Sequence, residues 1–311
     1  MQKTQMKGVL MLLLTAFIWG SSFVAQSVGM ENVEPFTFNG IRTLLGAVVL
    51  LPFILIGDAV KNKKNPVPRE VRKAENRRIL KMGAILGVIL CVAGNLQQYA
   101  FKWTSSGKIA FITAFYLLFV PLLGLFLKKK IAVPTWISLG AGCVGLYFIC
   151  IFGKGISGIN LGDMLTLLCS LGFAVHILTI ERFAGEVDSV KLSFVQFTVS
   201  GTITLILMFI FDEPSFTALK AAAVPLLYSG FLSCGVAYTL QIVGQKYTDS
   251  TVASLLMCSE SLFGVICSAI ILKERMTAGE TAGCVIMFAA IVLSQLDFKK
   301  LTQKHKARKP S

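Results

Sequence analysis

Apolar segments of about 20 residues recur along the whole 311-residue chain, and this recurrence restricts the fold more than any other feature. A helix of that length crosses the hydrocarbon core of a bilayer. Charged residues make up only 15% of the chain, against about 25% in a typical soluble domain. We therefore predict an all-α integral membrane protein without a soluble domain. We expect ten transmembrane helices, over residues 8–28, 36–56, 80–101, 107–127, 133–152, 161–180, 190–211, 220–244, 250–272 and 277–296.

An internal repeat divides these segments into two sets of five. Residues 96–106 (LQQYAFKWTSS) and 240–250 (LQIVGQKYTDS) lie 144 positions apart and share Leu, Gln, Lys, Thr and the final Ser. A second, weaker match, at an offset of 154 residues, aligns the N-terminal part of each half. Chance similarity is the alternative, but a polar match at a junction between segments is harder to obtain by chance. We predict two five-helix repeats, residues 8–152 and 161–296. Because each repeat has an odd number of helices, the second is inverted in the membrane.

Lys and Arg are distributed unequally between the two sides of the predicted helices. With the N-terminus inside, 23 of them lie on the inner side and six on the outer side. This bias predicts that both termini are cytoplasmic. Two basic segments, the loop 57–79 and the tail 297–311, are expected to lie against anionic lipid headgroups. The formal net charge of +14 then reflects topology, and we expect no nucleic-acid partner.

Motifs of enzymes and metalloproteins are missing from the sequence. All eight cysteines fall inside apolar segments, no C-x-x-C pair exists, and no His/Cys cluster has the spacing of metal ligands. Walker A, H-E-x-x-H and G-x-S-x-G motifs are also missing. We therefore expect no metal, no cofactor and no enzymatic activity.

Polar residues inside the predicted helices are the candidate functional residues, because each needs a partner or a cavity in the hydrocarbon region. Trp19 and Ser22 share one face of the helix 8–28, and His176 is the repeat equivalent of Ser22 in the helix 161–180. We expect all three to line a substrate cavity. The alternative is helix–helix packing, in which Ser and Thr form interhelical hydrogen bonds.

A second polar face lies at the end of the helix 80–101. Asn95, Gln98 and Tyr99 recur there at i, i+3 and i+4, and the repeat-equivalent helix 220–244 carries Tyr238 and Gln241 on a similar face. Amide and phenol groups can hold a polar metabolite by neutral hydrogen bonds, while aromatic rings cover its apolar part. We expect these five residues in the substrate cavity.

Glu260 lies near the middle of the helix 250–272, and its repeat equivalent is Tyr116. We expect both in the cavity. A carboxylate at that depth can carry a proton if its surroundings alternate, so Glu260 is the first candidate for proton coupling and His176 the second. The alternative is a structural ion pair of Glu260 with Arg42, with His176 or with another cation on a helix. Arg42 itself either binds a carboxylate or bonds a neighbouring helix.

Small residues give two of the helices a face for close packing. Gly279 and Gly283 form a G-x-x-x-G motif near the start of the helix 277–296, and Ala141 and Gly145 lie together on the helix 133–152. The motif predicts close helix packing, and a homodimer is its alternative use.

Three motifs are shared with a known family. The run Trp19–Phe23 (WGSSF) resembles W-G-x-x-F, Pro35 with Arg42 resembles P-x(6)-R, and Ser259–Arg275 resembles L-E-P…L-G-E-R-x-T. Together with ten helices in two repeats, these motifs make the chain similar to EamA-type permeases of the drug/metabolite transporter superfamily. The chain departs from the family pattern at Ser261, where Pro is common, and at Lys130, where Glu is common.

The resemblance implies a basket of ten helices around a central cavity. It also implies export or import of small metabolites such as amino acids or related compounds, in many members by proton exchange. We accordingly expect a secondary transporter, acting as an exporter by alternating access, in the plasma membrane, which is the inner membrane of a bacterium. A small-molecule substrate, protons and the lipid bilayer are its expected partners. The alternative is a membrane-embedded sensor or interaction subunit that docks a cytoplasmic partner through the basic loop and tail.

Overall fold

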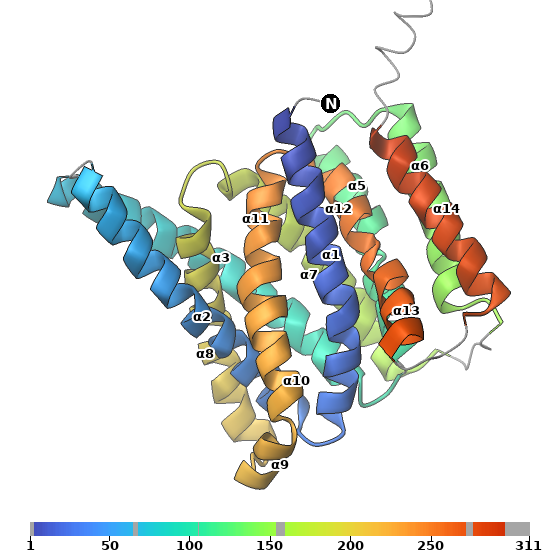
Figure 1. The fold of residues 1–311 in the computed structure, drawn as a ribbon, viewed down its shortest axis with the longest axis horizontal. Coiled ribbons are helices and arrows are strands. Elements are labelled where there is room, and N and C mark those ends of the chain that lie inside the picture. Colours follow the sequence, from blue (N-terminus) through green and yellow to red (C-terminus); the bar gives the residue numbers. More distant parts are fainter. Residues whose placement is uncertain (1–2, 65–67, 105, 154–158, 272–275, 296–311) are drawn as a thin grey trace, which may run out of the picture.

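The computed structural model describes residues 3–64, 68–104, 106–153, 159–271 and 276–295, and within these ranges all regular structure is helical (Figure 1). Nine helical stretches of the described residues are long and apolar enough to cross a membrane. A tenth apolar helix, over Ala278–Ser294, is shorter. The prediction of an all-α membrane protein with ten transmembrane helices is confirmed.

The helices follow the predicted segments in order, with three of the segments divided into shorter elements. The segment 107–127 forms α4 and α5, the segment 220–244 forms α10, the π-helix η1 and α11, and the segment 250–272 forms α12 and α13. The bounds are α1 Lys3–Met30, α2 Pro35–Lys64, α3 Arg69–Ala100, α4 Ser106–Thr113, α5 Tyr116–Phe126, α6 Val133–Cys150, α7 Leu161–Phe183, α8 Ser189–Phe211, α9 Phe216–Ala221, α10 Ala223–Tyr228, η1 Ser229–Tyr238, α11 Thr239–Gln245, α12 Ser250–Cys258, α13 Glu260–Ile271 and α14 Ala278–Gln295.

The prediction of a loop over residues 57–79 is wrong, because α2 continues to Lys64 and α3 begins at Arg69. Arg, Glu, Lys and Ala are good helix formers and fill most of the α3 extension. Pro68 stands directly before α3, where its missing N–H does no harm. The tips of α2 and α3 project together from the bundle at the upper left of Figure 1. The second basic segment, residues 297–311, lies outside the described residues.

Ion pairs tie the tip of α2 to the second half of the chain. Lys61 donates to Asp188 at 2.8 Å, and Lys191 pairs with Asp58 at 2.6 Å. Burial alone opposes ionisation of Asp188, but hydrogen bonds from Lys61 and from backbone N–H groups outweigh it and hold the pKa of this carboxyl below its ordinary value. These pairs connect the extended end of α2 to the start of α8.

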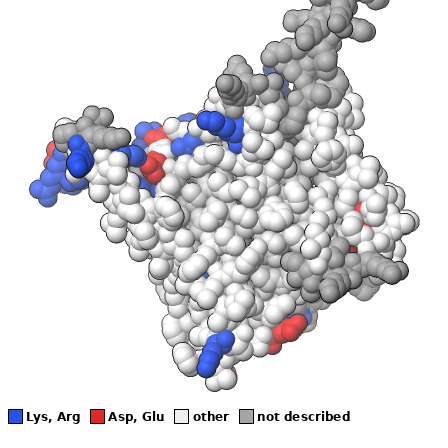
Figure 2. Space-filling model, in the orientation of Figure 1, with Lys and Arg blue, Asp and Glu red and all other residues white. Residues whose placement is uncertain are grey.

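Cationic side chains gather at the end of the bundle that carries the N-terminus. Figure 2 shows blue Lys and Arg atoms along this end, with few at the opposite end. Lys73, Arg77 and Lys81 are exposed near the start of α3. The last described residues of α14 lie at the same end (Figure 1).

The two halves of the chain interlock, and their contacts recur in repeat-related pairs. In the first half, α1 packs on η1, α11 and α13. Its counterpart α7 packs on α3 and α5, which correspond to the same elements in the other repeat. The counterparts α2 and α8 pack on each other, as do α6 and α14. Each half therefore buries its helices against the other half.

The small residues of α6 and α14 meet inside the chain. A Cβ added to Gly283 would lie 2.7 Å from the carbonyl oxygen of Gly145, and one added to Gly145 would lie 3.0 Å from the backbone nitrogen of Met287. Gly279 faces the ring of Phe152. The close packing that the G-x-x-x-G motif predicts is thus found between two helices of one chain.

Candidate functional site

Two membrane helices are broken at repeat-equivalent positions, and the breaks touch. The first break falls between α4 and α5, and the second falls at Ser259, between α12 and α13. Across them, the thiol of Cys258 donates to the carbonyl of Ala114 (3.5 Å), and the hydroxyl of Tyr116 donates to the carboxylate of Glu260 (3.3 Å). Both are pairs of residues 144 positions apart. Irregular backbone at membrane depth is tolerated where it lies inside the protein or lines a cavity.

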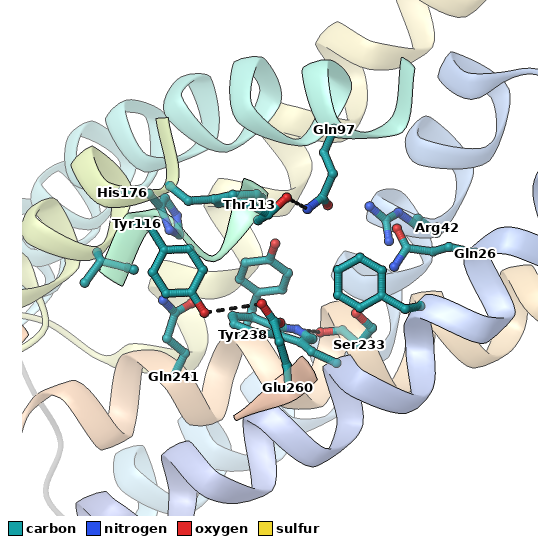
Figure 3. Close-up of a pocket in the computed structure, with 14 residues that line it drawn as sticks. Gln26, Arg42, Gln97, Thr113, Tyr116, His176, Ser233, Tyr238, Gln241 and Glu260 are labelled. Carbon is teal, nitrogen blue, oxygen red and sulfur yellow. Dashed lines mark hydrogen bonds between the residues drawn. The ribbon is translucent and has the colours of Figure 1, made fainter. Parts of the chain in front are cut away.

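A buried pocket lies at this crossing (Figure 3). Its free volume is about 40 Å³, enough for a few water molecules. Both halves of the chain contribute to its wall. The lining residues are Trp19, Phe23 and Gln26 of α1, Arg42 of α2, Gln97 of α3, Thr113 of α4, Tyr116 of α5, Phe173, His176 and Ile177 of α7, Ser233 and Tyr238 of η1, Gln241 of α11 and Glu260 of α13.

Aromatic side chains form one wall of the pocket. The rings of Trp19 and Tyr238 lie 4.7 Å apart between centroids, and Phe197 supports Tyr238 from behind at 5.7 Å. The indole N–H of Trp19 donates to the carbonyl of Ser233 at 3.4 Å. Ser233 belongs to η1, a ten-residue π-helix, and π-helical turns are frequent at functional sites. This wall can cover the apolar part of a bound molecule.

A close approach of α1 to α13 brings Trp19 near Glu260. Gly20 lies against the backbone of α13, so that an added Cβ would come within 2.7 Å of the nitrogen of Gly264. Only a residue without a side chain allows this spacing. The close packing of α1 on α13 therefore explains the Gly of the W-G-x-x-F motif, since it brings the neighbouring Trp19 close to the Glu260 carboxylate.

Two buried charged residues face the pocket without forming an ion pair. Only 4% of Glu260 and 7% of Arg42 is exposed, and an uncompensated charge at a helix centre costs roughly 2.5–3.5 kcal/mol on insertion scales. Within the described part of the chain, the hydrogen-bond partner of the Glu260 carboxylate is Tyr116, while Nε2 of His176 pairs with Gln196 at 3.1 Å. The alternative of a structural ion pair of Glu260 with Arg42 or His176 is therefore not found among these residues.

Several polar atoms of the pocket residues lack a hydrogen-bond partner among the described protein atoms. They are the side-chain carbonyls of Gln26 and Gln241 and the Nδ1 atom of His176. A buried polar group without a partner is costly, so water or a bound solute is needed to satisfy it. The pocket can thus offer hydrogen bonds to a polar molecule on several sides.

The ten residues predicted for a cavity divide into two groups in the structure. Asn95 and Tyr99 line a separate, more open groove bounded by α2, α3, α7 and α8. Ser22 is buried and donates to Ser229 at 3.4 Å, and Gln98 is fully buried. The other six lie together on the pocket wall: Trp19, Tyr116, His176, Tyr238, Gln241 and Glu260.

The sequence carried a signal for one pocket residue that the prediction missed. Gln97, rather than its neighbour Gln98, reaches the pocket and donates to Thr113 at 3.0 Å. Gln97 is the repeat equivalent of Gln241, which also lines the pocket. The Leu-Gln match between the repeats therefore identifies the correct face of α3 better than the i, i+3, i+4 pattern of polar residues does.

Ten membrane helices in interlocked halves, with two broken helices crossing at a buried polar pocket, define the class of multi-pass membrane transporters. The model of the EamA-like transporter family matches residues 6–151 and again residues 160–296. The chain belongs to this family, and the resemblance to EamA-type permeases is confirmed.

Proteins that are similar to this chain are also named as transporters. An uncharacterized transporter of Archaeoglobus fulgidus is 26% identical over 290 residues, which cover 92% of this chain and 84% of that protein. The uncharacterized transporter YoaV of Bacillus subtilis is 24% identical, over 94% of this chain and 98% of its own. The uncharacterized inner membrane transporter YedA of Escherichia coli is 26% identical over 70% of this chain and 65% of its own. A crystal structure with a TM-score of 0.73 and 15% identity covers 94% of this chain and 98% of its own, and shares the fold.

Proposed function

We propose that the chain is a secondary transporter that carries a small metabolite, such as an amino acid or a related compound, through the pocket by alternating access. The position of the pocket is the observation that supports this most, because both halves of the chain line it at the point where the broken helices cross. Rocking of one half against the other would expose the same residues to one side and then to the other. A free volume of about 40 Å³ is below that of ligand pockets, so binding requires the walls to separate.

We propose the plasma membrane as its location, with both termini in the cytoplasm and export as the working direction. The cationic end of the bundle supports this orientation, since Lys and Arg are enriched on the cytoplasmic side of membrane proteins. The name of YedA supports the inner membrane of a bacterium. Transport, rather than catalysis, is also what the family match favours.

Glu260 is the proposed proton carrier, with His176 second. The Glu260 carboxyl is buried and faces the pocket. It accepts a long hydrogen bond, from the hydroxyl of Tyr116 at 3.3 Å. When the walls separate, water reaches this group from one side at a time, so that it can bind a proton on one side and release it on the other. His176 lies on the same wall, and its Nδ1 lacks a partner among the described atoms.

Flux in proteoliposomes tests the function. Vesicles are loaded with a mixed metabolite pool rich in amino acids, and release is followed by mass spectrometry with and without a pH gradient. Release of a few compounds above the rate of protein-free vesicles is expected, and comparison of inward and outward flux decides the direction. If nothing crosses under any gradient, the transporter proposal is wrong.

Glu260→Gln tests the coupling, since glutamine keeps the size of the side chain and removes the proton. We expect this variant to lose the acceleration by a pH gradient, whereas Glu31→Gln, an exposed control outside the pocket, should keep it. Unchanged pH dependence in Glu260→Gln would leave Glu260 with a structural role only.

Trp19→Ala and Tyr238→Ala test the pocket wall. These variants should change which solute is transported more than they change the amount of folded protein.

A sensor or interaction subunit is the second candidate, and the projecting tips of α2 and α3 favour it. Lys73, Arg77 and Lys81 are exposed near the start of α3, and Figure 2 shows Lys and Arg atoms gathered where the two tips project. A soluble protein that co-purifies with the chain, and is lost when these three residues are replaced by glutamate, would support this function if no flux is found.

A further inference from the structure

Arg42 stands apart from the other partly buried cations of the chain. Lys108 pairs with Asp163 at 2.6 Å, and Lys129 pairs with Glu181. Arg42 is more deeply buried than either, with 7% of it exposed, yet no carboxylate of the described residues lies within ion-pair distance. A buried cation is retained without a counter-ion only at a cost, which a bound anion can offset.

A chain of buried hydrogen bonds holds one edge of the guanidinium. Nε of Arg42 donates to the side-chain oxygen of Asn39 (3.0 Å), and the amide nitrogen of Asn39 donates to Asn95 (2.8 Å). The amide nitrogen of Asn95 in turn donates to the hydroxyl of Thr204 (2.8 Å). These hydrogen bonds connect α2 through α3 to α8, so three helices fix the orientation of the Arg42 side chain. The ring of Phe38 lies 5.7 Å from the guanidinium carbon.

This arrangement leaves the far edge of the guanidinium free. Within the described residues, hydrogen bonding engages only Nε, and the four N–H donors of the two terminal nitrogens remain. Figure 3 shows the guanidinium beside Gln26, at the edge of the open space that the pocket residues surround. A fixed guanidinium with two free nitrogens matches the two oxygens of a carboxylate.

The charge of the rest of the pocket decides which anion fits. Among the described residues that line the pocket, Arg42 is the one Lys or Arg side chain, and Glu260 adds a carboxylate to the same wall. A dianion such as phosphate would meet one cation and one anion, whereas a single carboxylate is matched by Arg42 alone. An ammonium group on the same solute would find Glu260 and the rings of Trp19 and Tyr238.

We propose that Arg42 binds the carboxylate of the transported solute, and that Asn39 and Asn95 are positioning residues that hold it for this purpose. This inference rests on the proposed transport function and specifies its substrate class as monocarboxylates, with amino acids the best match. Asn95, predicted as a cavity residue, then acts through Asn39 and Arg42 without touching the solute.

The test compares matched solutes on wild-type protein and on variants. Phenylalanine, leucine and the other common amino acids are each compared with their carboxamides and decarboxylated amines, by flux in proteoliposomes and by thermal stabilisation in detergent. For at least one amino acid, we expect the acid to be carried and to stabilise the protein at concentrations at least tenfold lower than its amide or amine. Arg42→Gln should lose this preference, and Arg42→Lys should keep part of it.

Asn39→Asp is the sharpest variant, because it is isosteric, supplies a competing carboxylate at the Nε edge of Arg42 and removes the N–H that Asn39 donates to Asn95. We expect normal folding and at least a tenfold loss of apparent affinity for the acid, with little change for the amide. Asn32→Asp, an exposed residue in the connection after α1, is the matched control.

The outcomes separate this inference from the transport function. If solutes cross but the amide or amine is carried as well as the acid, or if Arg42→Gln keeps the preference, the carboxylate site is wrong and the transporter stands. If nothing crosses, the transporter fails, and stabilisation by an acid that is lost in Arg42→Gln would still support the site. If no acid stabilises the wild-type protein and none crosses, both are wrong.

Discussion

Replacing Gly20 by alanine should push α1 away from α13 and damage the pocket. The added Cβ would lie 2.7 Å from the backbone nitrogen of Gly264, and closer still to the carbonyl oxygen of Glu260. Helix backbone cannot turn aside as a flexible side chain can. The two helices must therefore separate by at least about 0.7 Å, the difference between 2.7 Å and an ordinary contact of 3.4 Å.

Two opposing effects set the size of the change. Overpacking a close contact costs about 1–3 kcal/mol. Alanine gains roughly 1 kcal/mol over glycine in a helix interior. The free energy of unfolding should therefore fall by about 0–2 kcal/mol for Gly20→Ala. At Gly57 of α2, a Cβ would meet nothing within 4 Å, so Gly57→Ala should raise it by about 1 kcal/mol. The same chemical change is expected to have opposite signs at the two sites.

Thermal unfolding in detergent with a thiol-reactive fluorophore measures the difference. Six of the eight cysteines are buried, so the dye reports unfolding. At roughly 2 °C per kcal/mol for a chain of this size, the apparent Tm should rise by about 2 °C for Gly57→Ala and fall by up to about 4 °C for Gly20→Ala. Flux should fall in Gly20→Ala alone, because Trp19 and Glu260 move apart. If Gly20→Ala is stabilised like Gly57→Ala and transports normally, the contact between α1 and α13 is wrong.

Two further changes test other contacts. Gly283→Leu places a side chain against the carbonyl of Gly145, where a Cβ alone would come to 2.7 Å. This variant should lower the apparent Tm by at least as much as Gly20→Ala. A change in oligomeric state with no loss of stability would show instead that this face binds a second copy. Asp188→Ala removes the N-cap of α8 and the partner of Lys61, and should cost about 0.5–2 kcal/mol at neutral pH. Because the folded-state pKa of Asp188 is lowered, its contribution is present above the ordinary carboxyl pKa and is lost as the pH falls through the folded-state value, so the wild type and variant should converge in acid. A gap that is unchanged in acid would contradict this.

Hydrophobic length was enough to determine the number of membrane helices. The bilayer sets that length, and backbone groups in hydrocarbon can be satisfied only within a helix or a closed barrel. The repeat, read from residues 96–106 and 240–250, also paired Tyr116 with Glu260 before any contact was known. These are properties of short stretches or of aligned positions, and they do not depend on how the helices pack.

Helix ends and breaks depended on the tertiary structure. The extension of α2 contacts the second half of the chain through Lys61 and Asp188, which are 127 residues apart, and a local sequence pattern does not contain that contact. The break at Ser259 contains no Pro or Gly. It is stabilised by its contact with the repeat-equivalent break 144 residues earlier, and a sequence window does not contain that contact.

The choice of the inward face was also left to packing. Lipid tails are as apolar as leucine, so a membrane helix shows little amphipathic pattern to separate its lipid side from its interior side. One residue turns a helix by about 100°, which is the whole difference between Gln97 on the pocket wall and Gln98 away from it. In the same way, the sequence placed Arg42 within a membrane helix. Only the packed structure decided that it faces the pocket with no carboxylate of the described residues beside it, because most of the pocket wall comes from other helices.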